Sequence, residues 1–176
     1  MTNDSFTFGG VDMYQEYGIM MLHYDIVLPP LRKRKISIPY RSGSYDYGAK
    51  YYDDRIITVE CDTRRSLTRE EIRELSYTLS KKNQIRFWNE PDKYYIGRIY
   101  DAGELKYLGT VGHEFTLRFE CDPFAYGEVV QTEFTGTLKP AYRGTAPTPT
   151  RITITNAGNT PVNGIQIRVR ERNEVY

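Results

Sequence analysis

Residues able to act as acids, bases or nucleophiles are few in this chain and lie far apart. His23 and His113 are the only histidines among 176 residues. No serine-nucleophile, zinc-protease, phosphate-binding or dinucleotide-binding motif is present. His113 begins a strand-like run in phase with Phe115, which predicts a half-buried structural histidine. Nucleophilic catalysis and a histidine metal site therefore have little support in the sequence.

Pairs of carboxylates are the remaining candidates for catalysis, because two carboxylates at a suitable separation suffice for glycoside hydrolysis. Neighbouring residues of a strand point to opposite faces, and residues two apart on a polar face are normally solvated. We therefore expect no enzymatic activity, and no cofactor or metal. The pairs considered are Asp53 with Asp54, Glu60 with Asp62, and Glu120 with Asp122.

The two cysteines, Cys61 and Cys121, have no partner at zinc-ligand spacing. Each lies in a strand-like run, in VECD and FECD. No run approaches the roughly 18 apolar residues of a membrane helix, and the N-terminus has no basic region followed by an apolar run. We expect the protein to be made in a cytoplasm, where both cysteines remain buried free thiols.

The charge balance argues against nucleic acids and membranes as partners. The net charge is +1, from 24 basic and 23 acidic residues. Nonspecific electrostatic binding to DNA, RNA or anionic lipid is therefore not indicated. The cluster from Arg32 to Lys35 is interpreted as a solvated loop or a lysine-protected edge strand.

The elements that would position these residues are mostly strands. Residues 55–62 place Ile57, Val59 and Cys61 on one face, which is the pattern of a half-buried strand. Residues 113–121 place Phe115, Leu117, Phe119 and Cys121 on one face. Residues 19–39 are interpreted as a strand, a diproline break, the basic cluster and a short second strand. Further strands are expected at 85–88, 94–100, 104–110, 151–156 and 165–170.

One helix is expected, in LTREEIRELSYTLSKK at residues 67–82. Thr68 and Glu71 have the spacing of a capping box, with Leu67 and Ile72 at the hydrophobic-staple positions. Leucines and isoleucine at helical spacing then mark one buried face. The fold class predicted from all these elements is mainly β with one α-helix (α+β), an antiparallel β-sandwich with a projecting hairpin.

Composition divides the chain into three parts. Residues 1–139 form the main domain, and residues 140–150, AYRGTAPTPT with the preceding proline, read as a proline-stiffened linker. Residues 151–176 carry two alternating segments, which are too few strands to close a sandwich alone. This tail either completes the first sheet or begins a second domain.

The segment IPYRSGSYDYGAKYYDDR, residues 38–55, is predicted to be a contact surface. Its tyrosines and arginines lie on a polar backbone broken by two glycines, which is typical of surfaces that bind another surface. The alternative is a tyrosine-rich hairpin packed on its own domain. The candidate interface residues are Tyr40, Arg41, Tyr45, Tyr47, Tyr51 and Tyr52.

The order of several motifs resembles the N-terminal domain of the distal tail proteins of long, non-contractile-tailed bacteriophages (siphophages) and their prophages. The motifs span roughly residues 6 to 130. Typical members carry glycine where Tyr40 stands and aspartate where Ser42 stands. The matching motifs are FGG…DMYQEYG, IPYRSGSYDYG, DDRIITVECD, LTREEIRELSYTLSKK, IRFWNEPDKYYIGRIYD and FTLRFECDPFAYGE.

The resemblance implies a structural protein of the virion tail tip, a baseplate hub component made in the host bacterial cytoplasm. It implies a hexameric ring that joins the tail tube protein to tail-tip proteins, among them a tail-associated lysin and a receptor-binding protein. Residues 145–162 look like the start of the galectin-like second domain of that family. The alternative function, from a different class, is a carbohydrate-binding β-sandwich module that stacks Trp88 and tyrosines on sugar rings.

Overall fold

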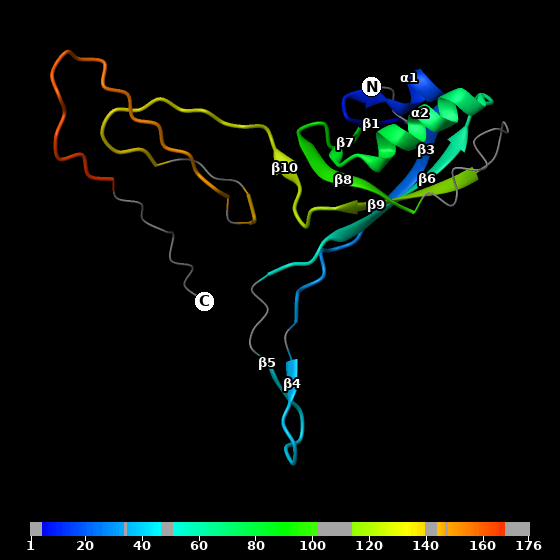
Figure 1. Ribbon diagram of the computed structural model, residues 1–176, viewed down its shortest axis with the longest axis horizontal. Coiled ribbons are helices and arrows are strands. Elements are labelled where there is room, and N and C mark those ends of the chain that lie inside the picture. The colour runs from blue at the N-terminus through cyan, green and yellow to red at the C-terminus, as the bar shows by residue number, and fades with distance from the viewer. Residues whose placement is uncertain are drawn as a thin grey trace. The chain divides into compact units, whose positions relative to one another are not determined.

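The computed structural model describes residues 5–33, 35–46, 51–101, 114–139, 144–146 and 148–167. The chain divides into two compact units, Met1–Gly136 and Thr137–Tyr176 (Figure 1). In the described residues of the first unit the elements are, in chain order, β1 (Phe6–Phe8), β2 (Val11–Asp12), α1 (Met13–Tyr17), β3 (Ile19–Ile26), β4 (Lys35–Ser37), β5 (Ser44–Asp46), β6 (Arg55–Thr63), α2 (Arg69–Ser80), β7 (Asn83–Phe87), β8 (Lys93–Asp101), β9 (Glu114–Cys121) and β10 (Tyr126–Gly127).

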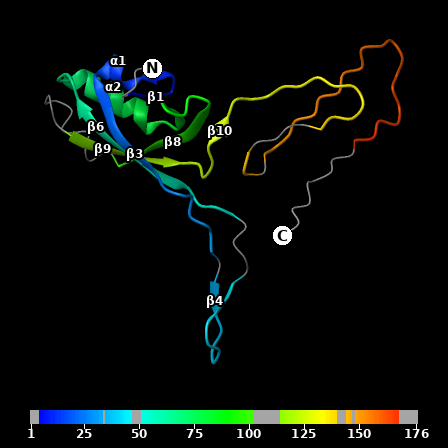
Figure 2. The same ribbon diagram turned by 180° about the vertical axis from the view of Figure 1, so that it is seen from behind.

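The main sheet is antiparallel and runs in the order β2-β1-β7-β8-β9-β6-β3, with β10 paired to β8. Its longest ladder joins β6 to β9, from the pair Arg55 and Cys121 to the pair Asp62 and Glu114. Figure 2 shows β3 beside β6, as their pairing requires. A second, two-stranded sheet is formed by β4 and β5.

The main sheet curls so that its edge strand β3 approaches β7. In a flat sheet β3 and β7 would lie about 19 Å apart, because four strand spacings separate them. Instead the rings of Tyr24 on β3 and Phe87 on β7 stack with their centroids 4.1 Å apart. The Tyr24 hydroxyl also donates a hydrogen bond to Asn89 Oδ1 at 2.6 Å. This closure makes the fold sandwich-like, and the predicted mainly β class is confirmed.

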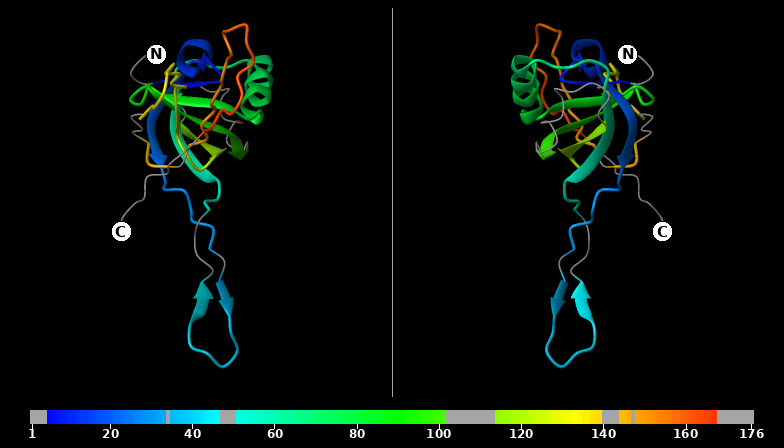
Figure 3. Two further views of the ribbon diagram at one scale, coloured as in Figure 1. Left: turned by 90° about the vertical axis from the view of Figure 1, so that its left-hand side faces the viewer. Right: turned by 90° about the vertical axis from the view of Figure 1, so that its right-hand side faces the viewer.

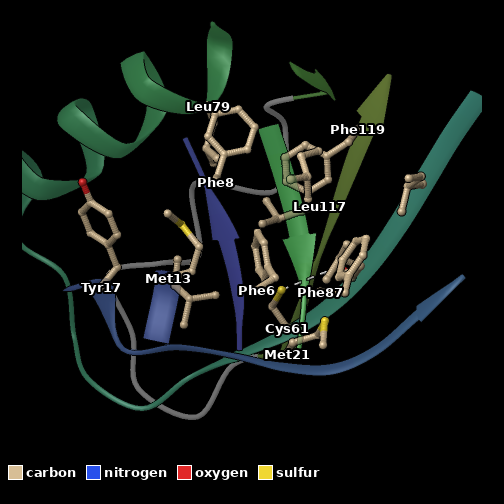
Figure 4. Packing of buried hydrophobic residues seen from close by; sticks show 14 of the residues in the cluster. Phe6, Phe8, Met13, Tyr17, Met21, Cys61, Leu79, Phe87, Leu117 and Phe119 are labelled. Atoms are coloured by element: carbon tan, nitrogen blue, oxygen red, sulfur yellow. Dashed lines mark hydrogen bonds between the residues drawn. The ribbon is translucent and has the colours of Figure 1, made fainter. Parts of the chain in front are cut away.

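Aromatic and aliphatic side chains fill the space enclosed by the curled sheet (Figure 4). Phe6 and Phe8 from β1 both pack on Phe119 from β9, with ring centroids 6.0 and 5.8 Å apart. The predicted inward face of β9 is confirmed. Its members Phe115, Leu117, Phe119 and Cys121 are all buried, as are Ile57, Val59 and Cys61 on β6.

Helix α2 covers the core and begins as its sequence predicts. The Thr68 hydroxyl accepts a hydrogen bond from the Glu71 N–H, and Glu71 accepts one from the Thr68 N–H. A hydrogen bond from the Arg65 side chain, followed by those from Thr68, lowers the pKa of Glu71 to about 2. Leu75 and Leu79 are fully buried, so the predicted apolar face of the helix is confirmed.

A second helix, α1, was not expected, and the prediction of a single helix is wrong. Asp12 caps its first turn by accepting hydrogen bonds from the N–H groups of Tyr14 and Gln15. Gly18 ends it in the left-handed conformation at φ +67°. Five residues are too few for helical periodicity to be recognised in the sequence.

The second unit has no strand or helix among residues 137–139, 144–146 and 148–167. The strand predicted at 151–156 is therefore not formed, nor is the described part, 165–167, of the strand predicted at 165–170. A strand needs a partner for its backbone and a surface to cover its apolar face, and two strands do not provide both. The predicted boundary at 139 and a second domain beginning at 151 remain predictions. The strand predicted at 104–110 and His113 lie outside the described residues.

Candidate interaction surface

Strands β4 and β5 pair as a short antiparallel ribbon (Figure 3). Its register puts apolar side chains on one face and polar side chains on the other. Ile36 lies directly opposite Tyr45, and Ser37 lies opposite Ser44. Ile36 and Tyr45 are 43% and 51% exposed. The ribbon therefore presents its apolar face to solvent.

Backbone contacts tie the two arms of the ribbon together at its base. Leu31 and Tyr52 form an isolated antiparallel bridge. The Arg32 N–H donates to the Tyr51 carbonyl at 2.8 Å, and Arg32 Nε donates to Asp53 Oδ1 at 2.6 Å. This ion pair is largely exposed, so it contributes little to stability by itself. The backbone hydrogen bond and the bridge between Leu31 and Tyr52 hold the two arms in register.

A tight turn forms at the far end of β4. The Arg41 N–H donates to the Ile38 carbonyl at 3.2 Å, across Pro39 and Tyr40. Tyr40 has φ +62° and Gly43 has φ +86°. The Tyr40 side chain is fully exposed, at 110% of its reference area.

The structure brings most of the predicted interface residues onto this ribbon and its base. Tyr40, Arg41 and Tyr45 lie at or near the turn, and Tyr51 and Tyr52 lie at the base; all five are exposed. Tyr52 also packs edge-on against Phe124, with ring centroids 5.3 Å apart. It is therefore partly held by its own domain. Tyr47 lies outside the described residues.

Exposed apolar residues next to the ribbon were missed in the sequence. Val27 and Leu28 join β3 to the ribbon and are 61% and 85% exposed. Their signal is an apolar run that continues beyond the end of the strand to a diproline. After β10, further exposed apolar residues follow along the first unit, at Val129, Val130 and Phe134.

The carboxylate pairs considered for catalysis are not arranged as an acid and a base. Lys82 Nζ lies 2.5 Å from Asp122 Oδ1, and Arg98 Nη2 lies 3.3 Å from Glu120 Oε2. These pairs line a cavity of about 260 Å³ whose lining residues are Asp54, Lys82, Arg98, Glu120, Cys121 and Asp122.

Opposed charges of this kind stabilise each other and leave little unpaired charge for chemistry. None of the described lining residues carries an aromatic ring on which a sugar could stack. No group of three or more metal-ligating side chains occurs within the described residues. Elsewhere, Glu60 is exposed on the outer face, and Asp62 lies 3.8 Å from Arg64.

The remaining candidates for a nucleophile or a base are the two cysteines and His23. Cys61 and Cys121 are free and buried, as predicted. Desolvation raises the pKa of Cys61, and it raises the pKa of Cys121 to about 12. Both thiols are therefore poor nucleophiles near neutral pH. His23 is exposed, with Nε2 3.0 Å from Asp25 Oδ1.

No helix in the described part of the chain is long and apolar enough to cross a membrane.

Comparison with known proteins supports the fold. No protein-family model matches the chain, and no curated protein matches its sequence. A solved structure that is similar is that of the SPP1 Dit protein (gp 19.1), described as a paradigm of the hub adsorption apparatus in phages that infect Gram-positive bacteria. The TM-score is 0.57 at 24% identity, over 70% of this chain and 52% of that chain. This chain thus matches about half the length of that protein, and the likeness establishes a shared fold.

Proposed function

We propose that this chain is a structural protein of a siphophage tail, a distal tail or baseplate hub component that is not an enzyme. The observation that carries the proposal is the fold shared with the SPP1 Dit protein across 70% of this chain. The ordered motifs between residues 6 and 130 point to the same family independently of the coordinates. The paired carboxylates and buried thiols also favour a structural role over catalysis.

The proposed assembly is a hexameric ring that joins the tail tube protein to tail-tip proteins, including a tail-associated lysin and a receptor-binding protein. A ring needs a head-to-tail contact in which one patch of a subunit meets a different patch of the next. The ribbon is suited to be one of these patches. An isolated two-stranded ribbon is at best marginally stable in water, and its exposed apolar face, with Ile36 and Tyr45, gains stability when a neighbour covers it.

The second unit is proposed to be the start of a further, galectin-like domain. Its alternating isoleucines and valines are exposed within the described residues, at Ile152, Ile154, Val162, Ile165 and Ile167. Such segments become strands when additional chain or a partner supplies the rest of a sheet. The proposed location of the assembled protein is the tail tip of the virion, after synthesis in the host cytoplasm.

The proposal is tested by measuring the mass of the purified protein with light scattering over a dilution series, together with electron micrographs. We expect rings of six subunits at high concentration, without any added sugar. The double variant Ile36→Ser, Tyr45→Ser removes the apolar face of the ribbon and should weaken assembly while circular dichroism remains unchanged. Tyr100→Ser is the matched control, because Tyr100 is 63% exposed on β8, away from the ribbon.

Two results would contradict the proposal. A wild-type protein that stays monomeric at every concentration, with no rings in micrographs, would refute self-assembly. Rings that form equally well in the double variant would keep the assembly and remove the ribbon from its interface.

A further inference from the structure

The turn at the end of β4 has a geometry that favours glycine at the position of Tyr40. The hydrogen bond from the Arg41 N–H to the Ile38 carbonyl closes a four-residue turn. Pro39 occupies its second position, and Tyr40 occupies the third with φ +62°. A proline followed by a residue with positive φ is the arrangement of a type II turn, in which the third residue is normally glycine or asparagine.

Tyr40 differs from every other described residue that has this backbone conformation. All of those are glycines, at positions 9, 10, 18, 43, 136 and 164. A bulky side chain in the left-handed region is a conformational outlier, and it lowers the population of that conformation by about tenfold relative to glycine. Glycine is used wherever else the described chain needs positive φ, so the tyrosine at this position needs a reason.

Contacts within the described residues do not provide that reason. The Tyr40 side chain is fully exposed, and no hydrogen bond, ion pair or ring contact within the described part of the chain involves it. Tyrosine offers a large, stiff, amphipathic contact surface at a small cost in side-chain entropy. The ring is therefore placed where another molecule can bury it.

We propose that Tyr40 is a contact residue that this chain carries on a strained turn in order to bind a second copy of the same chain. This inference rests on the self-assembly proposed above. It assigns the contact between copies to Tyr40, at the turn of the ribbon. Pro39 fixes the backbone before the ring, so the side chain meets its partner with little loss of freedom.

Charge distribution favours another copy of this chain as the partner. Residues 31–54, which contain the ribbon and its base, carry six basic and three acidic residues, a net charge of +3. The rest of the chain therefore carries −2 of the overall +1. Lys33, Lys35 and Arg41 are exposed. The net positive charge of this segment on one copy is thus complementary to the net negative charge of the rest of the next copy, which suits a head-to-tail contact.

The test compares Tyr40→Gly, Tyr40→Asn and Tyr40→Phe with the wild type. Glycine and asparagine remove the ring but suit the turn, and asparagine avoids the extra freedom of glycine. Phenylalanine keeps both the ring and the strain. Association is measured by light scattering over a dilution series at two salt concentrations. The ribbon's local stability is measured by amide hydrogen exchange in the dilute monomer, with circular dichroism to confirm folding.

We expect opposite effects on the two measurements. The glycine and asparagine variants should associate at least tenfold more weakly, while their ribbon amides exchange about fivefold more slowly because the strain is relieved. The phenylalanine variant should associate within about threefold of the wild type, since it keeps the aromatic contact area. Raising the salt concentration should weaken wild-type association.

Each contrary result overturns a defined part of the reasoning. If the wild type associates and the glycine and asparagine variants associate equally well, Tyr40 is not a contact residue, although the proposed function survives. Unchanged amide exchange in both variants would refute the strain argument. Association that appears only with a different protein would refute a second copy as the partner. A wild type that is monomeric throughout would refute the proposed assembly and this inference together.

Discussion

Substitution of Gly97 by alanine tests the packing of the sheet at its most restrictive point. Gly97 lies on the core side of β8, directly opposite Cys121 of β9, and Cys121 is in turn opposite Arg55 of β6. A Cβ atom at position 97 would lie 2.4 Å from Cys121 Sγ and 2.7 Å from the carbonyl oxygen of Glu120. The missing side chain thus leaves room for the sulfur and for close approach of the backbone.

The cost of the added methyl group follows from which atoms it would meet. The carbonyl oxygen of Glu120 belongs to the β9 backbone and cannot rotate away, so β8 and β9 would have to separate locally. Overpacking of this kind costs up to about 3 kcal/mol, and the reduced freedom of the unfolded chain on replacing glycine offsets about 0.5–1 kcal/mol. We expect a net loss of about 2 kcal/mol, which lowers the melting temperature by roughly 6–10 °C in a domain of this size.

Thermal unfolding followed by circular dichroism measures the effect, with Gly127→Ala as the control. Gly127 is also in a strand, but nothing lies within 4 Å of a Cβ atom built there, so its substitution should change the midpoint little. Combining Gly97→Ala with Cys121→Ala should recover part of the loss, because the sulfur contact disappears and the carbonyl contact remains. Equal midpoints for Gly97→Ala and Gly127→Ala would refute the register of β8 on β9.

Other perturbations test the core, the thiols and the helix cap. Leu117→Asp should prevent folding, because a buried unpaired carboxylate costs several kcal/mol, whereas Arg118→Ser on the exposed face should fold; circular dichroism distinguishes the two. Cys61 and Cys121 should react slowly with a thiol reagent in the native protein at pH 8 and give two thiols per chain after denaturation without reductant. The pKa of Glu71 is lowered in the folded state to about 2, so its stabilising contribution is present above the unfolded value of about 4.3 and is lost as the pH falls towards 2. The difference in melting temperature between wild type and Glu71→Gln should accordingly shrink from pH 6 to pH 2, and a difference independent of pH would contradict this assignment.

Sequence patterns correctly predicted the long elements that have one buried face. The alternation in β9 and β6 gave the core face correctly, because each is at least eight residues long and is buried on one side. The capping box of α2 was also correct, because its hydrogen bonds depend only on residues three apart. In these elements local preference and tertiary packing agree.

Long-range closure of the sheet could not be predicted from the same patterns. Tyr24 and Phe87 are separated by many residues and by four strand spacings, yet their rings stack. The sequence places each in a strand but does not specify which strands meet when the sheet curls. Similarly, β1 and α1 are too short for periodicity, and Phe6 and Phe8 become core residues because the fold packs them against distant residues such as Phe119.

The ribbon illustrates the limit of sequence reasoning about the candidate site. Composition predicts residues 38–55 to be a contact surface, and the structure places Ile36, which lies just before this segment, directly opposite Tyr45 on the ribbon. The backbone conformation of Tyr40 was not visible in the sequence, because proline followed by tyrosine is compatible with other turns. Its positive φ separates it from the other tyrosines in the described part of the chain, none of which has a positive φ. A residue whose conformation opposes folding and whose ring is exposed can contribute only when something binds it, so association measurements on Tyr40 variants carry more information than further stability measurements on the isolated domain.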